Sequence, residues 1–467
     1  MGADIPVPPP ERARALGTRR PGAGSRLTWR RSRLPAMSGA RRGVLSIAAG
    51  SAGGQVLALA AAPLLARIYR PADFGLFAVV SALAVTIGTV AALRWEMAIP
   101  IPERESDARA LVTLGLAAAC GTGAVGALLV LLLRDEVARW FDQPDLAPWL
   151  WVVPPTAAAM GTVLVLNQFA VRHRRYGMIG RRNLFQAVGV VAMQLVAGVA
   201  GLASGGLALG FGFGQVVAAG VLLRGARRRG AAPGGARFRG LAAVARRYRR
   251  FPFLMAPSGL LNILGTQLPV LLIASWYGST VAGWLGLTQR VIAMPIALVS
   301  SAVAQVYLAE IARAARERAA DGRRIFIGAT RRLALIAVPG AVAVVLAAPS
   351  AFSLIFGPQW HSSADYAQAL AVFMAAQFVA SPLSQTLVVF ERQGLQLAWD
   401  AGRVLVIAGA VSAVALADGS ALIAVWAFGL SGAVTYGVGW LMSLRVVTVA
   451  SRAARRAASS PRLVPQS

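Results

Sequence analysis

The stretch WLGLTQRVIAMPIALVSS, residues 284–301, is apolar over the length of a membrane-spanning helix except for one charged residue, Arg290. A helix needs about 20 apolar residues to cross the hydrocarbon core of a bilayer. A charged side chain near the centre of that core costs about 2.5–3.5 kcal/mol on insertion scales. Arg290 is therefore expected to point into the protein rather than into lipid.

Similar apolar stretches recur along the whole chain. Of its 467 residues, 57% are hydrophobic and only 14% are charged, whereas soluble proteins average roughly 25% charged residues. The sequence predicts an all-α polytopic membrane protein with about twelve transmembrane helices. These are expected at about 44–66, 75–93, 109–133, 147–171, 183–203, 206–223, 251–275, 281–308, 333–356, 365–390, 402–417 and 420–444.

An arginine-rich, partly Gly/Pro-rich segment divides the predicted helices into two groups of six. Part of this segment, LAAVARRYRR, is open to two interpretations: a basic amphipathic helix on the membrane surface, or the solvated loop that we favour. The predicted organisation is a disordered basic tail (1–42), an N-terminal lobe (43–223), a basic linker (224–250), a C-terminal lobe (251–446) and a second tail (447–467).

Two short patterns recur in both groups. Ala66, Tyr69 and Gly75 match Ala274, Tyr277 and Gly283, and Gln168, Arg175 and Gly177 match Gln385, Arg392 and Gly394. Duplicated transporters place their binding site between the repeats. The patterns therefore favour two pseudo-repeat lobes around a central cavity.

The arginines are distributed very unevenly. Of the 47 basic residues, 42 fall in one set of alternate loops and tails, four fall in the other set, and one is Arg290. Because cytoplasmic loops carry the excess of basic residues, both termini are predicted to be cytoplasmic, in a multi-pass protein of the cytoplasmic (inner) membrane. This placement accounts for most of the net charge of +29, so no nucleic-acid partner is expected.

The residues of common catalytic and metal sites are sparse. The chain has one cysteine, Cys120, and two histidines, His173 and His361, which lie in separate predicted loops. No phosphate-binding loop of the GxxxxGK[ST] type is present. We therefore expect no metal, no cofactor and no enzymatic activity.

At 100° per residue, Arg290 shares its helix face with small residues, among them Gly283 and Gly286, which suit close helix contacts or a cavity. All 18 acidic residues are expected in tails, loops or helix ends, so Arg290 has no evident partner. The planar donors of a guanidinium suit a diphosphate. The alternative is a structural arginine bonded to carbonyls freed by a proline kink.

The candidate substrate-binding residues are therefore Arg290, Gln289, Asn262 and Gln267. Three further residues at helix ends, Arg94, Glu96 and Arg67, are candidates for a gate. For Arg94 and Glu96 we favour the alternative, an ion pair on the surface at a helix end.

Three stretches carry a family resemblance. YRPADFGLFAVVSALAVTIGTVAALRWEMAIPIPERESDA (69–108), LPVLLIASWYGSTVAGWLGLTQRVIAMPIALVSSAVAQVYLAE (268–310) and IFGPQWHSSADYAQALAVFMAAQFVASPLSQTLVVFERQG (355–394) resemble bacterial lipopolysaccharide-biosynthesis flippases and polysaccharide exporters. These belong to the multidrug/oligosaccharidyl-lipid/polysaccharide exporter superfamily, and the similarity covers about residues 40–445.

The resemblance implies a flippase that moves a polyprenyl-diphosphate-linked oligosaccharide across the bilayer by alternating access, for lipopolysaccharide O-antigen, capsule or exopolysaccharide. A polysaccharide polymerase and a chain-length regulator would be its partners. Members of the family commonly have cationic cavities, whereas here only Arg290 is expected within a span. The alternatives are a cation-coupled multidrug antiporter of the same superfamily, which would need a buried carboxylate, and a non-transporting scaffold for glycan assembly.

Overall fold

The computed structural model describes residues 39–227, 238–317 and 321–459, and within these residues it consists of helices without strands. A helix satisfies its own backbone hydrogen bonds, which a bilayer requires of any spanning segment. Residues 1–38 of the predicted N-terminal tail, 228–237 of the predicted linker and 460–467 of the predicted C-terminal tail lie outside the described residues.

The N-terminal lobe contains the first helices of the chain. They are α1 (Gly39–Ile68), α2 (Pro71–Val90), η1 (Trp95–Ala98), α3 (Glu105–Trp140), α4 (Leu146–Trp149), η2 (Leu150–Val152), α5 (Val153–Arg172), α6 (Tyr176–Val199) and α7 (Ala203–Arg227). Helix α1 packs on α6, α6 packs on α7, and α3 packs on α5. The short helix α8 (Phe238–Arg247) follows and contacts α3.

The C-terminal lobe repeats this arrangement. Its elements are η3 (Phe251–Met255), α9 (Ala256–Arg316), α10 (Gly322–Phe356), η4 (Pro358–Trp360), α11 (His361–Leu383), α12 (Gln385–Val389), α13 (Gln393–Leu416) and α14 (Ala421–Ser459). Helix α11 packs between α10 and α14, and α13 contacts both α14 and α9.

Gly278 divides α9 into two helical halves, because its φ of 83° and ψ of 174° interrupt the helix. A positive φ is readily available only to glycine. The two halves, 256–277 and 279–316, correspond to the predicted helices at 251–275 and 281–308. Among the described residues, 11 segments are long and apolar enough to cross a membrane, and one of them, Phe251–Ile292, contains this break.

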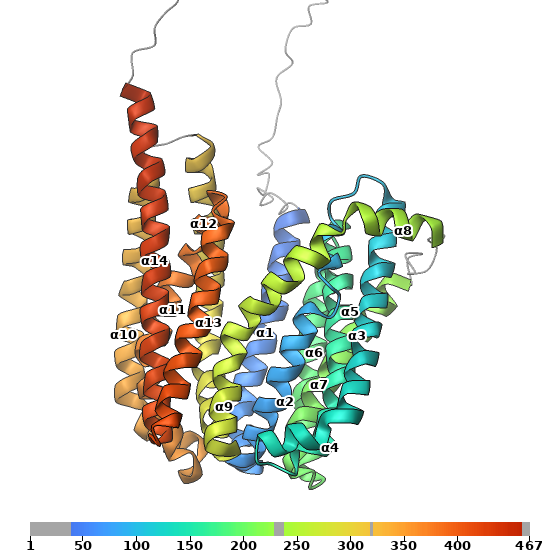
Figure 1. Cartoon of the computed structure of the whole chain (residues 1–467), viewed down its shortest axis with the longest axis vertical. Coiled ribbons are helices and arrows are strands. Elements are labelled where there is room, and N and C mark those ends of the chain that lie inside the picture. The colour runs from blue at the N-terminus through green and yellow to red at the C-terminus, as the bar shows by residue number, and fades with distance from the viewer. Residues whose placement is uncertain (1–38, 228–237, 318–320, 460–467) are drawn as a thin grey trace, which may run out of the picture.

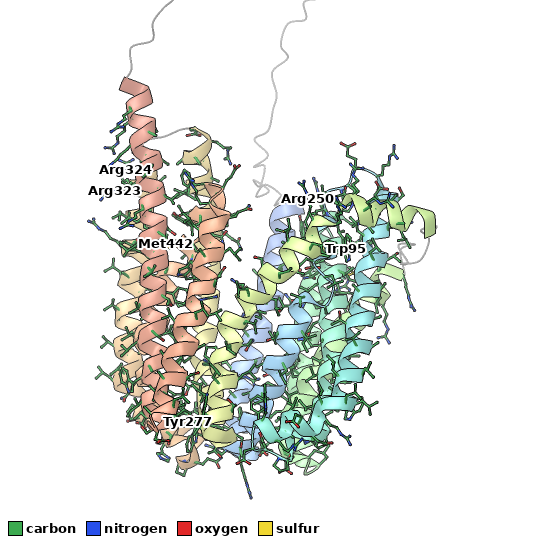
Figure 2. All side chains as sticks on the ribbon, in the orientation of Figure 1. Trp95, Arg250, Tyr277, Arg323, Arg324 and Met442 are labelled. Carbon is green, nitrogen blue, oxygen red and sulfur yellow. The ribbon has the colours of Figure 1, made fainter. Side chains whose placement is uncertain are left out.

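The two lobes converge at one end and diverge toward the other (Figure 1). Helix α1 begins and α14 ends at the diverging end, while the break in α9 lies at the converging end, where α2 packs along α9. Arg250, Arg323 and Arg324 lie at the diverging end, and Tyr277 lies at the other (Figure 2).

The predicted repeat is confirmed by the backbone of two equivalent turns. Arg174, between α5 and α6, has a φ of 54°, and Glu391, between α12 and α13, has a φ of 56°. Each is followed by an arginine, Arg175 or Arg392, that precedes the next helix with nearly the same backbone angles. A non-glycine residue with positive φ is uncommon, so the agreement indicates one motif used twice.

Several helix boundaries differ from the prediction. Helices α6 and α13 begin at Tyr176 and Gln393, well before the predicted starts at 183 and 402. Part of the predicted linker forms α8, whose Val244 is buried in the core, so the loop that we favoured there is wrong. The predicted C-terminal tail continues α14 to Ser459, in a stretch rich in the strong helix formers Ala and Arg.

Candidate functional site

Arg290 lies in the second half of α9 and is directed toward α2 of the other lobe. Its guanidinium carbon is 6.0 Å from the centre of the Phe77 ring. Its Nη1 atom is buried and has no hydrogen-bond partner in the part of the chain that the structure describes. A buried donor without a partner costs about 1–3 kcal/mol. Arg290 is therefore a cation at the lobe interface with unused hydrogen-bonding capacity.

Gln267 and Gln289, from the two halves of α9, line one polar cavity of about 250 Å³ in the C-terminal lobe. The other polar side chains that line it belong to Thr266 of α9, Gln377 of α11, Arg403 of α13 and Tyr436 of α14. The structure thus brings two of the predicted site residues together, and it adds an arginine that the sequence analysis did not place in a span.

Arg403 is only 5% exposed and holds a buried polar cluster together. Its Nη1 donates to the Tyr436 hydroxyl at 2.9 Å, and its Nη2 is 3.3 Å from Asp400 Oδ1. Its guanidinium also lies 4.9 Å from the Trp399 ring. Its Nε, however, is buried without a partner among the described residues, so the cation is not fully satisfied.

Asp400 overturns the expectation that every carboxylate lies in a tail, loop or helix end. It is 5% exposed and belongs to α13, within an apolar candidate span. Asn262 Nδ2 donates to its Oδ1 at 3.1 Å, and Gln396 Nε2 donates to its Oδ2 at 3.2 Å. The predicted site residue Asn262 therefore binds this carboxylate.

The expectation failed because α13 was predicted to start at 402. That boundary placed Asp400 in a cytoplasmic loop and Arg403 at a helix end. The two residues are three apart, a spacing that puts side chains on one helix face. An Asp–Arg pair at this spacing, preceded by Trp399, is the signal that could have revealed the cluster.

The gate candidates lie at opposite ends of α2. Arg94 follows α2, and its Nη1 is 3.6 Å from Glu96 Oε1. Glu96 is only 2% exposed, so the alternative of a surface ion pair is wrong. The Arg94 guanidinium lies against the backbone of α9, where a Cβ added to Gly259 would collide with it. Arg67 is exposed near the end of α1, before α2 begins.

This fold and these sites can be compared with known proteins. Residues 64–365 match the family described as "Polysaccharide biosynthesis protein". The chain belongs to this family. The resemblance of the three sequence stretches to proteins of polysaccharide biosynthesis is thereby confirmed.

One curated relative is the teichuronic acid biosynthesis protein TuaB of Bacillus subtilis (strain 168). It is 25% identical over 187 residues, which span 40% of this chain and 38% of TuaB. The aligned region therefore covers well under half of that relative.

Solved structures share the fold over most of the chain. The lipid II flippase MurJ in an inward closed conformation aligns with a TM-score of 0.67 and 11% identity, covering 86% of this chain and 89% of MurJ. An inward-facing multidrug resistance MATE family transporter aligns with a TM-score of 0.59 and 15% identity, covering 87% and 95%. At these identities the likeness shows the fold alone, that of a multi-pass membrane protein.

Proposed function

We propose that the chain is a flippase that translocates a polyprenyl-diphosphate-linked oligosaccharide across the cytoplasmic membrane by alternating access. The saccharide would serve surface polysaccharide synthesis, as O-antigen, capsule or exopolysaccharide. In this proposal the arginine-rich diverging end faces the cytoplasm, as the positive-inside rule requires.

The observation that carries the proposal is the guanidinium of Arg290, whose Nη1 has no hydrogen-bond partner among the described residues. Its buried Nη1 faces α2, at the seam between the two lobes. A diphosphate offers the two oxygens that a planar guanidinium binds in parallel. Binding the substrate would therefore satisfy this donor.

The polar cavity suits the saccharide. Side-chain amides of Gln267, Gln289 and Gln377 line it together with the rings of Phe373 and Phe428. Amides both donate and accept hydrogen bonds, as sugar hydroxyls require, and aromatic rings provide flat apolar faces. We assign Arg290 to the diphosphate and the glutamines to the sugars.

The test is a deletion strain complemented with variants. Lipid-linked saccharides extracted from membranes and polymer on the cell surface are measured together. We expect the deletion to accumulate the lipid-linked saccharide and lose the surface polymer. Wild type and Arg313→Ala, an exposed arginine on the same helix, should restore both, whereas Arg290→Ala at equal membrane abundance should not.

Two results would count against this assignment. If the deletion left the lipid-linked saccharides unchanged, the chain would not be their flippase. If Arg290→Ala restored both pools fully, the flippase would stand and Arg290 would be a structural residue.

Asp400 favours a second candidate, the cation-coupled multidrug antiporter, because that mechanism needs a buried carboxylate. In this structure Asp400 pairs with Arg403 at 3.3 Å and accepts two amide hydrogen bonds. A carboxylate so paired is less available to a proton or a metal cation, so we rank this candidate second.

Efflux of a cationic dye from cells separates the two candidates. The antiporter predicts that the deletion strain and an Asp400→Asn strain both retain dye, with normal lipid-linked saccharides. The flippase predicts unchanged dye efflux in both strains.

A further inference from the structure

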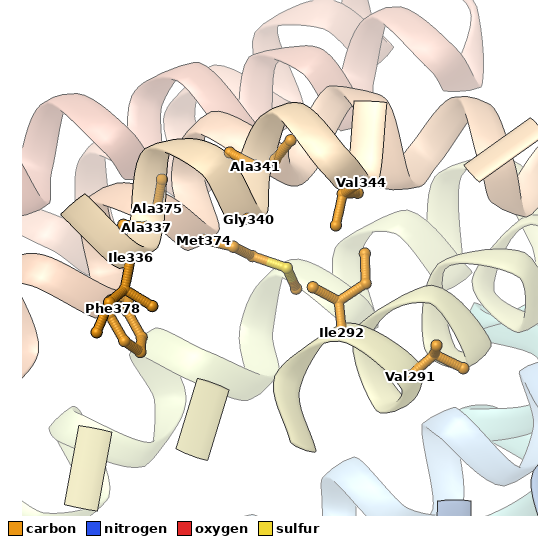
Figure 3. Close-up of a pocket in the computed structure, with 11 residues that line it drawn as sticks. Val291, Ile292, Ile336, Ala337, Gly340, Ala341, Val344, Met374, Ala375 and Phe378 are labelled. Atoms are coloured by element: carbon orange, nitrogen blue, oxygen red, sulfur yellow. The ribbon is translucent and has the colours of Figure 1, made fainter. Parts of the chain in front are cut away.

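Two pockets lie one after the other along the seam between the second half of α9 and α10. The first, of about 520 Å³, is lined by the charged residues Glu310, Arg324 and Arg332 among mostly apolar ones. The second, of about 350 Å³, is lined by Val291, Ile292 and other apolar residues (Figure 3). Ile336 lines both pockets, so they adjoin, and together they are called the α9–α10 groove.

One stripe of α10 forms the wall of this groove. Its residues recur every four positions: Arg324, Gly328, Arg332, Ile336, Gly340 and Val344. At about 1.5 Å rise per residue the stripe is about 30 Å long. A Cβ added to Gly328 or Gly340 would meet nothing within 4 Å. The groove is therefore hollow partly because Gly328 and Gly340 have no side chains. Close helix packing does not require glycine at either position.

The stripe changes from charged to apolar along its length. Arg324 lies at the diverging end of the molecule (Figure 2); it pairs with Asp321 at 3.4 Å. Arg332 lies eight residues further along α10, toward the apolar pocket. It is exposed and makes no ion pair within 4.0 Å in the described chain. The second pocket has no charged residue in its lining. With Glu310 also in its lining, the first pocket has two positive charges and one negative charge. A mouth with this excess of positive charge, followed by an apolar pocket, complements an anionic amphiphile.

The apolar pocket also adjoins the polar cavity of the candidate site. Met374 of α11 lines both, and Figure 3 shows it extending toward Ile292. Methionine is flexible and adapts to irregular shapes. The groove and the cavity that contains Arg403 and the glutamines therefore share one flexible lining side chain.

We propose that the α9–α10 groove is a loading site for the lipid part of the substrate: the diphosphate binds at Arg332 and Arg324, and the start of the polyprenyl chain occupies the apolar pocket. This inference rests on the proposed function. A diphosphate suits a site with two arginines, and a seam between two helices admits one chain more easily than the paired chains of a phospholipid.

The test uses the purified full chain in lipid nanodiscs and a photoreactive polyprenyl diphosphate as the probe. We expect cross-links to peptides of α10 and of the second half of α9. Gly340→Leu, which fills the apolar pocket, should remove them, whereas Gly409→Leu, at an exposed α13 glycine with equally open surroundings, should not. Arg332→Ala should weaken probe binding about tenfold, the effect of losing one charge-assisted hydrogen bond, and the neighbouring Arg331→Ala should leave it unchanged.

Competition identifies the occupant. Unlabelled polyprenyl diphosphate should displace the probe, and phosphatidylglycerol at the same concentration should not. Equal displacement by both would overturn the proposal and make the groove a site for ordinary membrane lipid.

The remaining outcomes separate this inference from the proposed function. Cross-links confined to other helices, together with full transport by Gly340→Leu in cells, would rule out the groove as the loading site. The proposed flippase function would be unaffected by that result. No cross-link anywhere in the chain, with unchanged lipid-linked saccharides in the deletion strain, would overturn both.

Discussion

Gly75 of α2 and Gly283 of α9 face each other's backbone in a reciprocal contact. A Cβ on Gly75 would collide with the carbonyl oxygen of Ser279, and a Cβ on Gly283 would collide with that of Pro71. Ser279 and Pro71 each lie four residues before the opposite glycine. The contact is therefore the same on both sides, as expected for equivalent positions of a repeat, and it brings the lobes together at the converging end.

Alanine at either glycine should destabilise this contact. Overpacking against backbone costs about 1–3 kcal/mol because the helices must separate. We expect Gly75→Ala and Gly283→Ala to lower the free energy of unfolding in detergent by that amount. The control Gly409→Ala, on an open helix surface, should instead stabilise by about 0.5–1 kcal/mol. If Gly75→Ala and Gly283→Ala were both as stable as wild type, α2 and α9 would not be in close contact at these glycines.

Arg290→Leu should stabilise the empty protein while abolishing transport. The substitution removes a buried donor that has no hydrogen-bond partner among the described residues, and such a donor costs about 1–3 kcal/mol. Thermal unfolding of the purified variant measures the gain, and the lipid-linked saccharide pool of the complemented strain measures the loss. A less stable Arg290→Leu protein would mean that the guanidinium supports the fold.

The Asp400–Arg403 pair should behave as a coupled unit. Removing one partner of a buried ion pair costs about 3–5 kcal/mol because the other charge remains buried. We therefore expect Asp400→Leu and Arg403→Met each to destabilise strongly, and the double variant to be more stable than either. A double-mutant cycle measures this coupling. Additive losses would show that the two charges do not depend on each other.

Tyr69 should make the stability depend on pH in the alkaline range. Burial, helped by the nearby charge of Asp73, raises the pKa of the Tyr69 hydroxyl to about 12, above the ordinary value of about 10. The neutral phenol, which donates to the Gln194 carbonyl at 2.6 Å, therefore contributes stability that is complete below pH about 10 and is lost as the pH rises to about 12.

The check is the free energy of unfolding of wild type and Tyr69→Phe between pH 8 and 12. We expect the variant to be about 1 kcal/mol less stable at pH 8, with the difference shrinking as the pH rises. Tyr176→Phe, a partly exposed tyrosine, is the control. A difference that stays constant to pH 12 would contradict the assigned pKa.

Apolar length was enough to predict the fold. Helix α2, which begins with Pro71 and is apolar over most of its length, starts four residues before the predicted 75. The repeat was also predictable, because Tyr69 and Tyr277 occur in the same short pattern, and both donate to a backbone carbonyl of their own lobe.

The polar cluster was not predictable by the same means. The N-terminal parts of α6 and α13 contain polar and charged residues, among them Arg181, Arg182 and Asp400, so hydropathy assigned them to loops in both lobes. In α6, Arg182 donates within its own helix, to Gln186 at 2.8 Å, but in α13, Arg403 donates to Tyr436 of α14. Satisfaction of a charge by another helix depends on tertiary contacts, which a single sequence does not display.

The direction of the repeat limits how this molecule can change state. Helix α2 and the second half of α9 both start at the converging end, so the pseudo-twofold axis runs along the membrane normal, as in transporters built from parallel repeats. Rotation about such an axis never exchanges the two faces of the membrane. A conformation open at the opposite face therefore cannot arise by an exchange of the conformations of the two lobes. It requires new contacts between the arginine-rich helix ends, which are separated in this structure. Mutual repulsion of those ends would favour the present state, and a bound polyanion would lower the barrier to closing them.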